Sequence, residues 1–215
     1  MVTSIERVGV DGCRGGWVIA SRIGVVVVPR LHLDRAIITG IDMPIGLAAN
    51  GRRACDFKAR EFLGARRSTV FPAPPRACIN DTTHAQANDT ARRVSGKGLS
   101  IQTFYLFVKI RELDDLVTPT DDDNVIEVHP ECAFATMCDD RPLPSKHTAE
   151  GIAQRTTLIE AEFGALPPTP KGAQLDDVLD AFAVLWSVER FARGAHRTFG
   201  DGARDERDLP MRIVC

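Results

Sequence analysis

The sequence contains no run of about 20 apolar residues, the length that an α-helix needs to cross a bilayer. Its start, Met1–Glu6, also lacks the basic and then apolar pattern of an export signal. We therefore expect a cytoplasmic protein that has no membrane partner.

Paired cysteine motifs are absent as well. The six cysteines are scattered along the chain, and no two of them form a CxxC motif. Free thiols are the usual state in a cytosolic chain, so we interpret Cys55 and Cys132 as unreactive. His129 and Cys132 would form only half of a zinc site, and the spacing of the other residues offers no convincing second half.

A large excess of one charge is missing too, since the formal net charge is −2 at pH 7. This argues against a protein that coats nucleic acid by charge alone. The charges are nevertheless unevenly placed: bases outnumber acids in residues 51–111, and the rest is acidic, with a run at 121–123. A basic central segment between acidic segments indicates a site that binds phosphates near a metal-binding cluster of acids. A solvated surface of mixed charge explains the pattern equally well.

The 215 residues are enough for one large domain, or for a domain with one insertion, and we find no internal repeat. Four strands come first, and a glycine-rich turn at 12–16 joins the first two as a hairpin. We expect strands at 6–11, 17–20, 25–28, 37–42 and 125–130, with a small edge strand at 211–214. We expect helices at 53–63, 83–93, 100–116, 148–163 and from 175 to at least 186, with Ser100 as an N-cap and residues 101–110 mostly buried. This order predicts a three-layer α/β fold with a mixed sheet.

Two of the predicted strands end on a carboxylate. Asp11 ends the first strand and Asp42 ends the fourth. If these strands are parallel neighbours, the two side chains meet at one edge of the sheet. Two unit charges ~4 Å apart repel by roughly 4 kcal/mol at an effective dielectric constant of 20. Either some of the carboxylates are protonated, or hard cations such as Mg²⁺ or Mn²⁺ neutralise them.

The last predicted helix carries a further acidic pair on one flank. Asp177 and Asp180 are three residues apart, and Asp176 with Asp180 is the alternative pair. Such acids also match the dipole at a helix start, so an ordinary first turn remains an open interpretation.

Four sequence blocks together resemble a bacterial family of unknown function, domain of unknown function 429, described as predicted ribonuclease-H-like nucleases. The blocks are Val10–Trp17, Ile41–Leu47, Glu127–Glu131 and Asp177–Ala181. The acids on the first strand, the fourth strand and the last helix are similar to those of the Holliday-junction resolvase branch of the ribonuclease-H-like superfamily. The resemblance implies one ribonuclease-H-like domain over residues 1–215. Its five-stranded sheet would have the order 3-2-1-4-5, helices on both faces, and a helical, basic insertion at about 51–116 between strands 4 and 5.

The resemblance also implies a site. The catalytic candidates are Asp11, Asp42, Glu127, Asp177 and Asp180. All of these except Glu127 would bind Mg²⁺ or Mn²⁺, and Asp11 would contact both ions of a pair. Glu127 is either an additional ligand or a support for one, and Glu131 is a ligand or half of a salt bridge at the rim. The candidates for substrate contact are Arg14, Arg66, Arg67, Lys109 and His129, with Ser68, Thr69 and Gln102 equally explained by capping and packing. His129 also fits a buried histidine with a hydrogen-bond partner.

The leading functional hypothesis is a metal-dependent nuclease that cleaves structured DNA or RNA with two metal ions. The alternative is a non-catalytic domain of the same fold that binds nucleic acid or a nucleotide. A third hypothesis is a phosphotransfer enzyme of the sugar-kinase and actin type, because Asp11–Gly15 places an acid and glycines after strand 1. That architecture needs two domains, and this chain supplies one. A homodimer is expected only by analogy with the resolvases.

Overall fold

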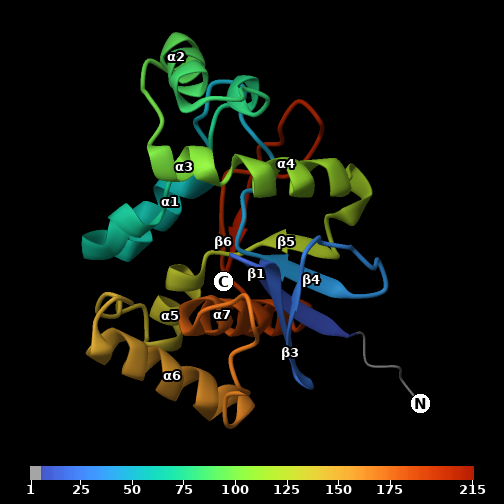
Figure 1. Ribbon diagram of the computed structural model, residues 1–215, viewed down its shortest axis with the longest axis vertical. Helices are drawn as coiled ribbons and strands as arrows, with labels where there is room; N and C mark the ends of the chain where they lie inside the picture. The colour runs from blue at the N-terminus through green and yellow to red at the C-terminus, as the bar shows by residue number, and fades with distance from the viewer. Residues whose placement is uncertain (1–5) are drawn as a thin grey trace.

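The structure is a computed structural model, and it describes residues 6–215. Its centre is a five-stranded sheet in the order β3-β2-β1-β4-β5 (Figure 1). The first three strands are antiparallel neighbours, whereas β4 is parallel to both β1 and β5. The strands are β1 Arg7–Cys13, β2 Gly16–Ser21, β3 Gly24–Val28, β4 Ile38–Ile41 and β5 Val125–Glu127. The predicted α/β class, the mixed sheet and the strand order are confirmed.

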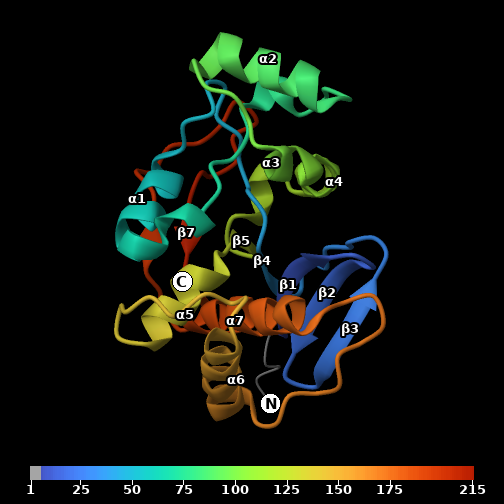
Figure 2. The same cartoon turned by 60° about the vertical axis from the view of Figure 1, so that its left-hand side comes forward.

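Helices cover both faces of this sheet. The helices are α1 Ala54–Leu63, α2 His84–Ser95, α3 Ile101–Tyr105, α4 Phe107–Leu116, α5 Pro130–Met137, α6 Ala149–Phe163 and α7 Leu175–Ala192. On one face, Phe107 and Ile110 of α4 pack in a cluster with Val10 of β1. On the other face, α7 packs against Val18 and Ala20 of β2, and α6 packs against α7 (Figure 2). The result is three layers.

Helix α7 is the most deeply buried element that covers the sheet. Every residue from Val178 to Glu189 is buried, so this segment has no solvated side. A Cβ at Gly9 of β1 would collide with the backbone atoms Ala181 O and Leu185 N. The missing side chain at Gly9 therefore lets α7 lie directly on the central strand.

Four predictions of local structure differ from the observed elements. The first strand, expected to end at Asp11, continues in its pairing with β2 to Cys13, so Asp11 lies within β1 and only Arg14 and Gly15 form the turn. The strand expected to reach Pro130 ends at Glu127, and Pro130 begins α5, because a proline is tolerated in the first turn of a helix. The helix expected at 100–116 is divided into α3 and α4, although Ser100 caps α3 as predicted. Its apolar residues are not all buried, since Tyr105 is 71% exposed and Val108 is 65% exposed.

The remaining elements lie outside the main sheet. The expected edge strand near the end of the chain is β7 Ile213–Val214, which pairs with β6 Thr198–Phe199 as a separate two-stranded sheet. Between β4 and β5, the predicted insertion contains α1 to α4, and α2 lies at one end of the molecule in both views (Figures 1 and 2). No helix within residues 6–215 is long and apolar enough to span a bilayer.

Candidate carboxylate site

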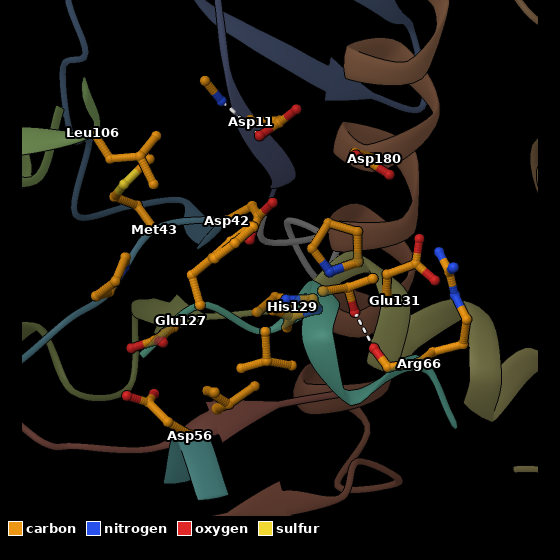
Figure 3. Close-up of a pocket in the computed structure, with 18 of the residues that line it drawn as sticks. Asp11, Asp42, Met43, Asp56, Arg66, Leu106, Glu127, His129, Glu131 and Asp180 are labelled. Carbon is orange, nitrogen blue, oxygen red and sulfur yellow. Dashed lines mark hydrogen bonds between the residues drawn. The ribbon is translucent and has the colours of Figure 1, made fainter. Parts of the chain in front are cut away.

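Three aspartates from distant parts of the chain line one pocket. Val10 of β1 and Ile41 of β4 are parallel partners, and Asp42 N donates to Val10 O at 2.9 Å. This register puts Asp11 and Asp42 at the same edge of the sheet. Side chains alternate along a strand, so Asp11 points to the face opposite Val10, where α7 presents Asp180. Figure 3 shows the three carboxylates in the pocket, with Asp11 on β1, Asp42 directly after β4 and Asp180 on α7.

Burial and neighbouring charges disfavour the ionisation of all three carboxyl groups. Burial raises the pKa of Asp11, and the charges of Asp42 and Asp180 raise it further. Burial and then the charge of Asp180 raise the pKa of Asp42 in the same way. Burial raises the pKa of Asp180 to about 6, although Lys146 opposes the shift. Positive charge at the cluster, such as a bound cation, would favour the ionised form of these carboxyl groups.

One of these carboxylates has a buried oxygen without a hydrogen-bond partner among the described residues. Asp11 Oδ1 accepts from Gly12 N at 2.7 Å, and Asp180 Oδ2 accepts from Lys146 Nζ at 2.6 Å. Asp180 is only 4% exposed, yet its Oδ1 has no hydrogen-bond partner among the described residues. A buried carboxylate oxygen without a partner is costly, so this atom is expected to face a cation or another donor when the site is in use.

The pocket has a volume of about 430 Å³ and is open on one side. Apart from the three aspartates, its polar lining comes from the insertion, from the end of β5 and the start of α5, and from the connection between α5 and α6. These residues include Arg66, Ser68, Thr69, Glu127, His129, Glu131, Ser145, Lys146 and His147.

Glu127, a predicted catalytic residue, lies in the pocket wall but is bound by Arg53. Arg53 donates from Nη2 to Glu127 Oε1 at 2.6 Å and from Nη1 to Glu127 Oε2 at 2.7 Å. The same guanidinium binds Asp56, and Ile45 N also donates to Glu127. Arg53 is 1% exposed, so this buried network holds β5, α1 and the segment after β4 together. We therefore assign Glu127 to the support of the pocket rather than to metal binding.

Asp177, a predicted metal ligand, does not line the pocket. Its Oδ2 accepts from Gln174 N at 2.7 Å in a capping box at the start of α7. The third position of a helix favours such a contact, so the ordinary first-turn interpretation describes this residue. Asp176, the alternative partner of Asp180, lies 3.7 Å from Lys146 Nζ.

The predicted substrate residues divide into two groups. Arg66 and His129 line the pocket, and burial lowers the pKa of His129, which keeps the ring neutral at pH 7. Arg14 and Arg67 are exposed and lie outside the pocket lining. Lys109 is outside it as well, because its ammonium donates to Gly16 O and lies 4.5 Å from the centre of the Trp17 ring.

One charged contact of the pocket, that of Lys146, was not predicted, and the salt-bridge alternative describes Glu131. Lys146 lies in a connection without helical or strand periodicity, so no pattern in the sequence points to it. Glu131 had been considered as a ligand or as a rim salt bridge, and it is bound by Arg155 Nη2 at 2.7 and 2.8 Å. Arg155 is 1% exposed, so this salt bridge is buried.

The pocket aspartates fit a hard divalent cation by their chemistry. Carboxylate oxygens are the ligands that Mg²⁺ and Mn²⁺ prefer, and the unpartnered Asp180 Oδ1 is available to one. Within residues 6–215, however, no three His, Cys, Asp or Glu side chains are already arranged as a metal site. A cation would therefore have to draw the three carboxylates closer together.

Comparison with known proteins gives a family and no function. A family model described as "Protein of unknown function (DUF429)" matches residues 9–205, a range that includes all three pocket aspartates. No curated protein matches the chain. No solved structure matches it either. The chain therefore belongs to the DUF429 family of proteins of unknown function.

Proposed function

We propose that this protein is a divalent-metal-dependent nuclease of the ribonuclease-H-like type. The observation that carries the proposal is the convergence of Asp11, Asp42 and Asp180 in one pocket, where Asp180 Oδ1 is buried without a partner. The strand order β3-β2-β1-β4-β5, with acids on β1, directly after β4 and on the last helix, also supports it.

Each group of the pocket has a role in this proposal. Mg²⁺ or Mn²⁺ held by the three aspartates would polarise a phosphoryl oxygen and lower the pKa of a water molecule. Arg66, in the pocket lining, is suited to bind a phosphate of the substrate. The neutral His129 adds no charge to the site and, as a neutral imidazole, has one nitrogen able to accept a proton.

One observation favours a second candidate, a non-catalytic domain that binds nucleic acid or a nucleotide. Lys146 already neutralises part of the carboxylate charge, and no metal geometry is formed in advance among the described residues. Such a domain would bind substrate through Arg66 without needing the aspartates.

Cleavage assays separate the two candidates. The purified protein is incubated with single-stranded, duplex and branched DNA and RNA, with Mg²⁺, with Mn²⁺ or with chelator. We expect metal-dependent cleavage that falls to background in Asp11→Asn and in Asp42→Asn. Asp123→Asn, at an exposed position away from the pocket, should cleave like wild type. No cleavage of any substrate, or unchanged cleavage by Asp11→Asn, would contradict the nuclease.

A further inference from the structure

Lys146 brings a positive charge into the carboxylate cluster from another part of the fold. It lies in the connection between α5 and α6, and its Nζ is 2.6 Å from Asp180 Oδ2 and 3.7 Å from Asp176 Oδ2. Its side chain is 31% exposed, whereas that of Asp180 is 5% exposed. The ammonium is therefore a largely buried cation that contacts α7 at the pocket.

This ammonium also belongs to the pocket of the whole cluster. Lys146 lines the same pocket as Asp11, Asp42 and Asp180, and it enters from a different part of the fold than any of them. It therefore supplies positive charge where a cation would otherwise be needed.

The balance of charge limits how many metal ions the pocket can accept. The other charged groups of the lining cancel, since Arg53 and Arg66 balance Asp56 and Glu127, and Arg155 balances Glu131. Three ionised aspartates and one ammonium then leave two negative charges, which one divalent ion neutralises. A second divalent ion would leave two uncompensated positive charges in a buried site, which is unfavourable in a medium of low dielectric constant. The hydrogen bonds of Asp180 are consistent with a single metal ion, because its Oδ2 is bound to Lys146 and its Oδ1 is the oxygen without a partner among the described residues.

We infer that Lys146 fills one of the two cation positions expected at this carboxylate cluster, so that the pocket takes a single divalent ion. The inference rests on the proposed function, and it replaces the expected pair of metal ions with one ion and one lysine. Lys146 is then the fixed positive charge of the site, whereas the Mg²⁺ or Mn²⁺ is exchangeable.

Calorimetric titration with Mn²⁺ alone tests this inference without any assay of activity. Wild type should bind one Mn²⁺ per chain. Lys146→Met removes the fixed charge, so its affinity for the first Mn²⁺ should be at least about tenfold higher. Lys146→Arg keeps the charge and should resemble wild type. Lys97→Met, at an exposed lysine far from the pocket lining, is the matched control and should leave binding unchanged.

Several outcomes would overturn the inference. Two Mn²⁺ ions bound to wild type would do so without any variant, even if Lys146→Met failed to fold. Equal affinities in wild type and a folded Lys146→Met would also do so, and both results would leave the nuclease to be judged by its cleavage assay. Binding to Lys146→Met alone would mean that the lysine excludes the metal. Binding to neither protein would overturn this inference and the metal-dependent nuclease together.

Discussion

The three pocket aspartates illustrate at the scale of single residues how a candidate site costs stability. Each carboxyl group has a pKa raised by burial and by its neighbours. A raised pKa in the folded state means that the folded form binds the proton more tightly than the unfolded form does. Proton binding therefore stabilises the folded protein at pH values below the unfolded pKa of about 3.9. That stabilisation is lost as the pH rises through the folded pKa, which is about 6 for Asp180.

Asp42→Asn should consequently stabilise the protein at neutral pH when divalent ions are chelated. Within residues 6–215 no hydrogen bond to the Asp42 carboxylate is present, so the amide loses no partner, and it removes one of the charges that repel Asp11. We expect a melting temperature a few degrees above wild type at pH 7.5, since ~1 kcal/mol corresponds to about 2–4 °C at this size. The difference should shrink towards pH 4. A variant that melts below wild type at pH 7.5 would contradict the assigned repulsion.

Glu127→Ala should strongly destabilise the fold. The change removes one partner of Arg53, which is 1% exposed, and breaking a buried pair in this way costs about 3–5 kcal/mol. Urea unfolding measures the loss, and Arg141→Met, in an exposed pair, should change stability by less than about 0.5 kcal/mol. A stable Glu127→Ala protein with reduced Mn²⁺ affinity would instead make Glu127 a metal ligand.

The sequence predicted that Asp11 and Asp42 would meet at one edge of the sheet, although Asp42 follows the end of β4 whereas Asp11 lies within β1. Asp11 and Asp42 follow paired residues of parallel strands, so their neighbourhood could be inferred once the strands were assigned. The sequence could not decide the role of Asp177. Its position three residues before Asp180 fits a metal ligand on the same helix flank, and it also fits a capping residue in the first turn. Lys146 could not be predicted at all, since only the tertiary fold brings its connection to α7.

At the scale of elements, the contact between β1 and α7 decides whether Asp180 reaches Asp11. Gly9 permits this contact, because a Cβ there would collide with the backbone of α7. The observed helix after β5 and the division at Leu106 were not predicted. A proline such as Pro130 can end a strand or begin a helix, and the apolar pattern at 101–110 fits one helix or two. Tertiary packing decides between these structures, and the sequence does not show that packing.

Gly9→Ala should therefore affect stability and metal binding together. The added methyl group must push α7 away from β1, and overpacking of this kind typically costs about 1–3 kcal/mol. Moving α7 also moves Asp180 from Asp11, so the affinity for Mn²⁺ should fall in the folded variant. Urea unfolding and Mn²⁺ titration of the same sample measure both effects. Reduced stability with unchanged Mn²⁺ affinity would show that this contact does not position the site.

At the scale of the whole molecule, the predicted basic insertion is largely used for internal contacts. Arg53 is paired with Glu127 and Arg76 with Asp205, both outside the insertion, and Arg76 also pairs with Asp114 inside it. Arg66 remains in the pocket lining, and its Nε has no hydrogen-bond partner among the described residues. The composition showed the excess of bases in residues 51–111, but only the fold shows which of them are available to a substrate.

Arg66→Ala should weaken substrate binding without removing catalysis. We expect a higher KM for nucleic acid with a smaller change in kcat, and a salt dependence of binding reduced by about one charge. Arg67→Ala, which removes an exposed neighbour outside the main pocket lining, is the matched control. Equal effects of the two substitutions would mean that Arg66 has no special position in binding.

The most direct test of the account is thermal melting of wild type and Asp11→Asn with and without Mn²⁺. If Asp11, Asp42 and Asp180 bind the ion, Mn²⁺ at a hundredfold excess over Kd adds ~2.7 kcal/mol to the folded state of wild type. That stabilisation corresponds to a rise in melting temperature of roughly 5–10 °C at this size, and Asp11→Asn should show little of it. An unshifted wild type, or an equal shift in Asp11→Asn, would contradict a metal site at these carboxylates.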